Sequence, residues 1–259
     1  MKKFALVTGA SSGLGLELSN QLAEKGFNLI LVSRTEKTIQ KIKADINNRF
    51  GVEVVTMPVD LSVPKNAETL FHNIEALGLH VSVLVNNAGV GIYGDFTKTD
   101  LVDELNMIQL NITSLVVLTK LFLQKFVSQR EGKILNIASL LSFLPFPYFS
   151  VYSATKAFVL AFTETVAAEV EGTGVSVLAL CPGPIDTGFN TDTMLNTAAY
   201  KTNKPMSAKS VAKIGIKLLE KGRGKAIAGF NNWFISNLPR ITPDFIMIKI
   251  KKSLASQKK

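Results

Sequence analysis

Apolar residues along the chain are gathered in short runs that alternate with longer segments of helix length. The runs are mainly apolar and do not alternate regularly with polar positions, which is typical of a strand buried on both faces. Strands that alternate with helices predict a parallel sheet with helices on both of its faces. The expected strands are 4–7, 29–32, 52–57, 81–85, 133–137 and 175–180, with a seventh at 225–228.

The segments between these runs are predicted to be helices. The first helix opens at a group of glycines, and its apolar residues Leu14, Leu18, Leu22 and Ala23 share one face. Further helices are expected near 35–50, 64–77, 100–128, 152–170 and 208–221.

No repeat or low-complexity linker interrupts this pattern before about residue 230. We therefore expect residues 1–259 to form a single α/β domain, a doubly wound Rossmann-type fold with a seven-stranded parallel sheet and helices on both faces. Two stretches stand apart from the pattern. Residues 186–206 are polar and rich in threonine, as in a substrate loop, and 230–259 form a basic, apolar extension whose structure the pattern leaves open.

Composition narrows the class of protein. Hydrophobic residues make up 47% of the 259 residues and charged residues 19%, which fits a globular protein. The single cysteine, Cys181, excludes an intrachain disulfide, and its apolar setting favours a core thiol over a redox or metal site. With two histidines and no Cys/His cluster, we expect no metal. A signal peptide and an uninterrupted apolar run of spanning length are not seen, so we expect a cytoplasmic protein.

The net charge of +9 is concentrated near the C-terminus. Residues 200–259 hold 14 Lys and Arg against 2 Asp and Glu, whereas 1–199 hold 15 against 18. This excess is explained either by a solvated face or by a weak contact with an anionic membrane or an acidic carrier protein. Lys249 and Lys252, for example, oppose Ile246, Met247 and Ile250 on a helical projection. Nucleic acid is not expected, since base-stacking aromatics do not interleave with the basic residues.

A glycine-rich turn follows the first expected strand and leads into a helix. Glycines let the backbone approach a pyrophosphate closely, and the helix N-terminus offers free N–H groups and a positive dipole end. A tight turn without a ligand needs similar residues, but the position after the first strand favours a dinucleotide site. The expected contacts here are Gly9, Ser11, Ser12, Gly13, Leu14 and Gly15.

Arg34 follows the second expected strand, where a site for NAD would place an acidic residue on the ribose. No carboxylate competes with it before Glu36. An arginine pairs with the 2′-phosphate of NADP, which an acidic residue would repel. Unless Arg34 is only an exposed loop residue, the sequence predicts NADPH (NADP+) as the cofactor.

Polar or small residues also follow the other expected strands. The carboxyl ends of parallel strands share one edge of the sheet, which is where ligands bind in such folds. We therefore expect the residues to line one rim, although Asn87 could simply cap a turn. They are Asp60, Leu61, Asn87, Ala88, Gly89, Ser139, Pro182, Gly183, Ile185 and Thr187.

Tyr152 and Lys156 lie four residues apart, on one face of an expected helix. Matching a tyrosine pKa of about 10 to neutral pH requires stabilising the phenolate by roughly 4 kcal/mol. A lysine ammonium at about 4 Å supplies energy of that order. The pair could also be an ordinary exposed helix face, but Ser139 at a neighbouring strand end favours a reactive site.

Together these residues resemble the short-chain dehydrogenase/reductase family in its compact form, over roughly residues 4–190. The resemblance implies an oxidoreductase in which Tyr152 is the general acid of carbonyl reduction and Ser139 holds the substrate oxygen. It also implies that Lys156 binds the nicotinamide ribose and lowers the tyrosine pKa, and that Asn111 holds a water that relays protons to Lys156. From its neighbours alone, Asn111 could equally be a polar interruption in a helix.

The expected reaction is NADPH-dependent reduction of an apolar ketone or aldehyde, or the reverse oxidation. The alternative is a regulatory protein that binds NADP(H) without turnover. Phe189, Met194 and Leu195 are candidates for a mobile lid. The residues expected to form an apolar pocket wall are Leu140, Leu141, Phe143, Leu144, Phe146 and Phe149.

Oligomerisation is expected through the helix at 100–128. Its apolar positions exceed one core-facing stripe, and the resemblance implies a dimer interface there, in a homodimer or homotetramer. The residues concerned are Ile108, Ile112, Leu115, Val116, Leu118 and Leu121.

Overall fold

A computed structural model describes residues 2–144, 146–189, 195–240 and 242–255 of the chain. Seven parallel strands form the main sheet, in the order β3-β2-β1-β4-β5-β6-β9, which confirms the predicted fold class. The order reverses beside β1, and this switch point opens the edge at which such folds bind ligands. The strands are β1 (Phe4–Thr8), β2 (Asn28–Ser33), β3 (Val54–Pro58), β4 (Val81–Asn86), β5 (Gly132–Ile137), β6 (Val175–Pro182) and β9 (Lys225–Ala228).

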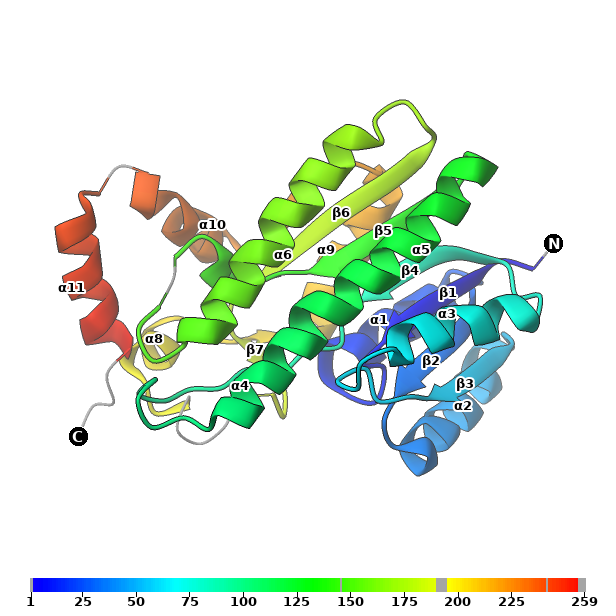
Figure 1. Ribbon diagram of the computed structural model, residues 1–259, viewed down its shortest axis with the longest axis horizontal. Coiled ribbons are helices and arrows are strands. Elements are labelled where there is room, and N and C mark those ends of the chain that lie inside the picture. The colour runs from blue at the N-terminus through cyan, green and yellow to red at the C-terminus, as the bar shows by residue number, and fades with distance from the viewer. Residues whose placement is uncertain (1, 145, 190–194, 241, 256–259) are drawn as a thin grey trace.

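Helices cover both faces of the sheet (Figure 1). The first face carries α1 (Gly13–Glu24), α2 (Glu36–Phe50) and α9 (Ala208–Lys221). The second carries α3 (Asn66–Ala76), α5 (Ser114–Gln129) and α6 (Ser150–Glu169). The apolar runs are buried because each strand is covered on both sides.

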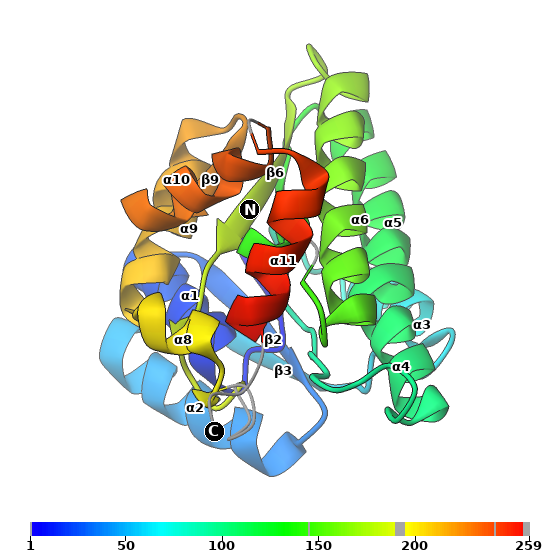
Figure 2. The ribbon, with the colours of Figure 1, turned by 90° about the vertical axis from the view of Figure 1, so that its left-hand side faces the viewer.

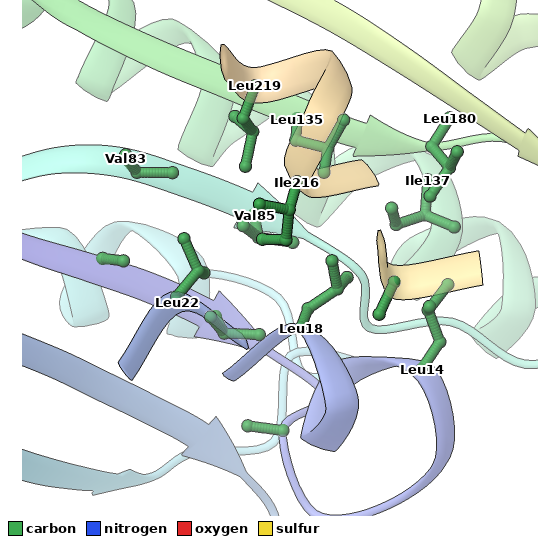
Figure 3. Close-up of a cluster of buried hydrophobic side chains, with 14 of the residues drawn as sticks. Leu14, Leu18, Leu22, Val83, Val85, Leu135, Ile137, Leu180, Ile216 and Leu219 are labelled. Atoms are coloured by element: carbon green, nitrogen blue, oxygen red, sulfur yellow. The ribbon is translucent and has the colours of Figure 1, made fainter. Parts of the chain in front are cut away.

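The core on the first face shows how sequence spacing becomes packing (Figure 3). Leu14, Leu18 and Leu22 of α1 point to the sheet and meet Ile216 and Leu219 of α9 above β4 and β5. All five side chains are buried. This packing holds the start of α1 against the sheet, at the carboxyl edge.

The expected helix at 100–128 comprises α4 (Leu101–Ile108), a π-helical segment (Gln109–Thr113) and α5. The Asp100 side chain caps it by accepting from the N–H groups of Val102 and Asp103 at 2.8 and 3.1 Å. By length and composition alone Leu101–Gln129 is apolar enough to cross a membrane, although polar residues interrupt it throughout. Its inner face is core: Phe122 and Phe126 are fully buried.

Two late parts of the chain lie over the carboxyl edge of the sheet: the described residues of 185–207, and those of 230–255, which belong to the extension whose structure the sequence left open. The strand arrows in Figure 1 point toward this end, and Figure 2 looks onto it with α11 between α8 and α6. The elements concerned are β7 (Ile185–Asp186), α8 (Ala198–Thr202), β8 (Met206–Ser207), α10 (Phe230–Asn237), a 3-10 turn (Leu238–Arg240) and α11 (Asp244–Ala255).

Candidate active site

A cavity of about 640 Å³ lies along the carboxyl edge of the sheet. Its walls come from the ends of β1 to β6, so residues far apart in sequence meet in one place. Every residue expected to contact the cofactor lines it, as do Ser139, Tyr152 and Lys156. Asn111 is not among the described residues that line it.

The glycine turn forms one wall of the cavity. Gly9 and Gly13 have φ angles of 66° and 54°, which favour glycine. A Cβ on Gly15 would lie 2.2 Å from the Gly9 carbonyl oxygen, so α1 begins in direct contact with the turn. No acidic side chain occupies the first turn of α1, which leaves its positive dipole end for an anion.

Asn87 holds this turn in place. Its Nδ2 donates to the carbonyl oxygens of Thr8 and Gly9 at 2.9 and 3.2 Å. The Thr8 hydroxyl oxygen in return accepts from the backbone N–H groups of Asn87 and Ala88, each at 3.0 Å. The side-chain amide of Asn87 therefore braces the phosphate turn, which is the turn-capping role that its position also allowed.

Arg34 and Asp60 lie at the far end of the cavity, after the neighbouring strands β2 and β3. Burial raises the pKa of the Asp60 carboxyl, but hydrogen bonds from Ser62 and the charge of Arg34 lower it below its usual value. The expectation that no carboxylate competes before Glu36 is therefore incomplete. Asp60 is distant in sequence but adjacent in the sheet.

Tyr152 and Lys156 lie one turn apart on α6 and face the cavity. The Lys156 ammonium donates to the Ile137 carbonyl oxygen at 2.8 Å and lies 5.9 Å from the centre of the Tyr152 ring. The side chains of Ser139 and Tyr152 are joined by a hydrogen bond. The Ser139 hydroxyl also accepts from the Leu141 N–H at 3.1 Å, so a short 3-10 turn fixes its position.

The pKa values in this arrangement correct one expectation. Burial raises the pKa of Tyr152 to about 12, and only its hydrogen bond with Ser139 opposes the shift. Burial also lowers the pKa of Lys156, to about 8. The expected lowering of the tyrosine pKa by Lys156 is not found, because the ammonium is directed to a backbone carbonyl and desolvation outweighs its charge.

Asn111 lies in the π-helical segment, fully enclosed. Its Nδ2 donates to the Val90 carbonyl at 2.9 Å and to the Thr155 hydroxyl oxygen at 3.1 Å, and its Oδ1 accepts from the Val90 N–H at 3.0 Å. A Cβ on Gly89 would come within 3.0 Å of Asn111 Oδ1 and 3.5 Å of Lys156 Nζ. Asn111 therefore joins the loop after β4 to α6 behind the reactive side chains.

The other end of the cavity has an apolar wall. Leu140, Leu141, Leu144, Phe146 and Phe149 line it, as expected. Phe143 was wrongly placed there: it packs against a core cluster, and its ring lies 5.3 Å from Lys225 Nζ. Phe143 follows the short 3-10 turn directly, and its side chain is directed away from the cavity.

Of the expected lid residues, Phe189 lines the cavity, with its ring centre 5.9 Å from that of Tyr152. Leu195 is half-buried and is not among the described lining residues. Met194 lies outside the described residues.

Several lining residues were missed by the sequence reasoning. They come from the α8 region and the C-terminal helices, where no motif marks them. Two polar contacts fasten these parts: Asn203 Nδ2 donates to Asn232 Oδ1 at 2.7 Å, and the Tyr93 hydroxyl donates to the Ala255 carbonyl at 2.7 Å. The missed residues include Thr197, Tyr200, Thr202, Asn203, Ile235 and Leu254.

Within the described part of the chain, no group of three or more His, Cys, Asp or Glu residues is placed to hold a metal ion. Cys181 is buried in β6, and burial raises the pKa of its thiol to about 12. It behaves as the expected core thiol.

Comparison with known proteins agrees with this geometry. Residues 3–198 match the family described as short chain dehydrogenase. The protein belongs to the short-chain dehydrogenase/reductase family. A very-long-chain 3-oxoacyl-CoA reductase of Pyrenophora tritici-repentis is 33% identical over 90% of this chain and 71% of its own length. The 17-beta-hydroxysteroid dehydrogenase type 3 of Mus musculus is 34% identical over 72% of this chain and 61% of its own length.

A solved structure has the same fold. It is a short-chain dehydrogenase from Sphingobium yanoikuyae in complex with NADPH, with 26% identity and a TM-score of 0.82 over 93% of this chain and 94% of that one. The short-chain dehydrogenase/reductase described here is therefore an oxidoreductase that acts on alcohol or carbonyl groups with a nicotinamide dinucleotide.

Proposed function

We propose that the protein uses NADPH to reduce the ketone or aldehyde group of an apolar molecule, or catalyses the reverse oxidation. One observation carries this proposal: a single cavity joins Arg34, the glycine turn, Tyr152 and an apolar wall. Arg34 and the glycine turn suit a phosphorylated dinucleotide, and the apolar wall beside Tyr152 suits an apolar carbonyl compound.

The residues present fit the cofactor. A Cβ on Gly9 would come within 2.9 Å of Ala88 Cα, and one on Gly13 within 3.1 Å of Thr187 Cγ2, so glycine keeps this cradle open. The start of α1 would hold the pyrophosphate and Arg34 the 2′-phosphate. When bound, NADPH supplies the hydride that the carbonyl carbon accepts. The NADPH complex of the relative from Sphingobium yanoikuyae supports this choice.

The proton comes from the protein. With a pKa of about 12, the Tyr152 phenol is protonated at neutral pH and can donate to the carbonyl oxygen as the C–H bond forms. The Ser139 hydroxyl, already hydrogen-bonded to Tyr152, would hold the same oxygen. The phenolate would then recover a proton from solvent, and the nearby Lys156 would stabilise it while it is charged.

The substrate that we propose carries its ketone on a large apolar body. Two relatives are named for such molecules, 3-oxoacyl-CoA and hydroxysteroids. Leu144, Phe146 and Phe149 provide an apolar surface beside Tyr152. Burial of an alkyl chain or a steroid skeleton there would contribute about 25 cal/mol per Å² of apolar surface.

The test is NADPH oxidation by purified protein with 3-oxoacyl-CoA esters of increasing length and with a 17-ketosteroid, and NADH in parallel. A Tyr152→Phe variant should lose about 10²–10⁴-fold in kcat while retaining NADPH binding. A variant as active as wild type would refute the role of Tyr152. Tight NADPH binding without turnover of a broad panel of carbonyls and alcohols would instead favour a regulatory protein.

A homodimer or homotetramer formed through the long helix is also part of the proposal. Leu115 and Leu118 are buried in the core of the chain itself, so they cannot form part of the expected interface. Leu101, Val102, Leu105 and Ile108 of α4, by contrast, are exposed and would be covered by a second copy. Light scattering at micromolar concentration tests this, and a monomeric mass would contradict it.

A further inference from the structure

Exposed apolar side chains are concentrated on the two C-terminal helices. Among the residues that the structure describes, seven of the sixteen exposed large hydrophobic side chains belong to α10 and α11. Exposing large apolar side chains to water is unfavourable, and a cluster of them on one surface typically marks an interaction site. The seven are Phe230, Trp233, Phe234, Phe245, Ile246, Ile248 and Ile250.

The outer face of α10 is aromatic. Phe230, Trp233 and Phe234 have i, i+3, i+4 spacing and are 79%, 52% and 57% exposed. The rings of Phe230 and Trp233 stack with their centres 5.8 Å apart. The opposite face of the helix holds the buried Asn232 and Ser236, so α10 is firmly seated while its aromatic side remains uncovered within the chain.

The outer face of α11 mixes apolar and basic residues, so the expectation that Lys249 and Lys252 oppose Ile246 and Ile250 is wrong, because all four are exposed. Phe245 and Ile246 are exposed there, and Lys249 and Lys252 are exposed beside them. Met247, on the inner face, is buried. Lysines among large apolar residues are typical of a helix that lies in the plane of a membrane surface, because the lysine stem is apolar and its ammonium reaches the headgroups.

Both helices stand at the carboxyl edge of the sheet (Figures 1 and 2). Their inner sides contribute Ile235 and Leu254 to the wall of the cavity. The same two helices therefore separate the cavity from the exterior and carry the apolar outer faces.

We propose that the outer faces of α10 and α11 form a docking surface for an anionic lipid bilayer, so that the cavity is held close to the membrane. Trp and Phe side chains are favourable at the boundary of headgroups and acyl chains, and lysines are attracted to anionic lipid. This proposal concerns where the protein binds and requires no particular substrate.

Charge favours a bilayer over a second copy of the chain. Residues 200–259 hold 14 basic against 2 acidic residues, so two copies meeting through this surface would bring charges of the same sign together. An acidic carrier protein would match the lysines but would leave Phe230, Trp233 and Phe234 without an apolar partner. An anionic bilayer satisfies both the charged and the apolar parts of the surface.

The chain contains its own probe, since Trp233 is its only tryptophan. Full-length protein is mixed with phosphatidylcholine vesicles with and without phosphatidylserine. We expect it to co-sediment with the phosphatidylserine vesicles at low salt, and the Trp233 fluorescence to shift to shorter wavelength. Binding should weaken in high salt, which screens the lysines.

Paired variants separate the two contributions. Phe230→Ser with Phe234→Ser should lower vesicle binding at least about tenfold, and Lys249→Glu with Lys252→Glu should do the same. The matched controls are Leu77→Ser, an exposed leucine after α3, and Lys37→Glu with Lys41→Glu on α2, which should bind as wild type.

Several results would overturn the proposal. One is the absence of both co-sedimentation and a fluorescence shift at saturating lipid, and another is an equal loss of vesicle binding in the control variants. A third is that the protein self-associates without binding vesicles, and that the Phe230 and Phe234 substitutions abolish this self-association. Binding to an acidic protein but not to vesicles would also overturn it. Turnover of a water-soluble ketone without vesicles is measured in parallel and should be unchanged in all variants, which keeps this test separate from that of the reaction.

Discussion

Asn111 and Val90 hold each other through two reciprocal hydrogen bonds, with the Val90 N–H donating to Oδ1 at 3.0 Å and Nδ2 donating to the Val90 carbonyl at 2.9 Å. A side-chain amide is suited to this because it offers one acceptor and two donors. The second donor reaches Thr155, whose own hydroxyl donates to the Tyr152 carbonyl at 2.8 Å. The backbone of Tyr152 is thus linked to the loop after β4 through two side chains.

Asn111→Ala removes this link. The Val90 N–H and carbonyl lose their partner, so we expect the free energy of unfolding to fall by about 1–3 kcal/mol, together with a lower kcat. Urea unfolding and steady-state kinetics measure the two effects. Thr113→Ala, at an exposed position of the same π-helical segment, is the control. Unchanged stability in Asn111→Ala would show that the link contributes nothing.

Arg34→Ala tests the choice of cofactor. Loss of a charge-assisted hydrogen bond to a phosphate costs about 1.5–3 kcal/mol, so the Kd for NADPH should rise by roughly 10–150-fold while that for NADH changes little. Fluorescence titration with each dinucleotide measures this. Lys41→Ala removes an exposed positive charge from the neighbouring helix α2 and should leave both affinities unchanged. An equal effect on NADH and NADPH would argue against recognition of the 2′-phosphate.

Gly91→Ala tests the substrate end of the cavity. The new Cβ would lie 3.0 Å from Phe189 Cζ and 3.3 Å from Tyr152 Cδ2. Crowding of this kind costs about 1–3 kcal/mol, so kcat/KM for a bulky ketone should fall at least about fivefold with the Kd for NADPH retained. At Gly188 an added Cβ meets nothing within 4 Å, and Gly188→Ala should behave as wild type. An unaltered kcat/KM in Gly91→Ala would mean that Phe189 moves away freely.

Lys156 makes stability depend on pH. Burial lowers its pKa from 10.5 to about 8, so between these values the unfolded chain binds the extra proton and stability rises with pH. The stability gained when Lys156 loses its proton is lost as the pH falls through 8. Relative to Lys156→Met, the wild type should gain about 2 kcal/mol between pH 8 and pH 10.

Comparing the two proteins isolates this effect, since Cys181 and Tyr152 retain their protons in the fold and oppose the rise at high pH. Urea unfolding across this range is the measurement. Parallel curves for wild type and Lys156→Met would show that the ammonium is not desolvated.

Much of the fold follows from the sequence because the strands are covered on both faces. A run such as 81–85 is apolar except at Ser82, which is also buried, and the structure extends the strand only to Asn86. The edge strand β3 is less clear: the expected range of 52–57 became Val54–Pro58, because four of its five residues are partly or fully exposed and burial does not set its ends. The meeting of the strand ends at one edge could be predicted because all strands of a parallel sheet end at the same edge.

The remaining features depend on contacts that no local pattern encodes. Whether Lys156 faces Tyr152 or a backbone carbonyl decides the direction of the tyrosine pKa, and spacing on a helix does not show this. Phe143 and Phe146 look alike in sequence, but Phe146 lines the cavity whereas Phe143 packs against a core cluster. The Tyr93 and Ala255 contact spans 162 residues, so the place of α11 over the cavity could not be inferred.

The contacts of Asn203 with Asn232 and of Tyr93 with Ala255 have a consequence for how such a protein diversifies. They fasten the substrate side of the cavity from the C-terminal third of the chain, whereas the dinucleotide side is built by the first six strands. Changes in the late segments can therefore alter the molecules that are accepted while the hydride and proton chemistry is inherited intact. Part of the substrate specificity can therefore change independently of the catalytic residues, because these late segments lie far from them in the sequence.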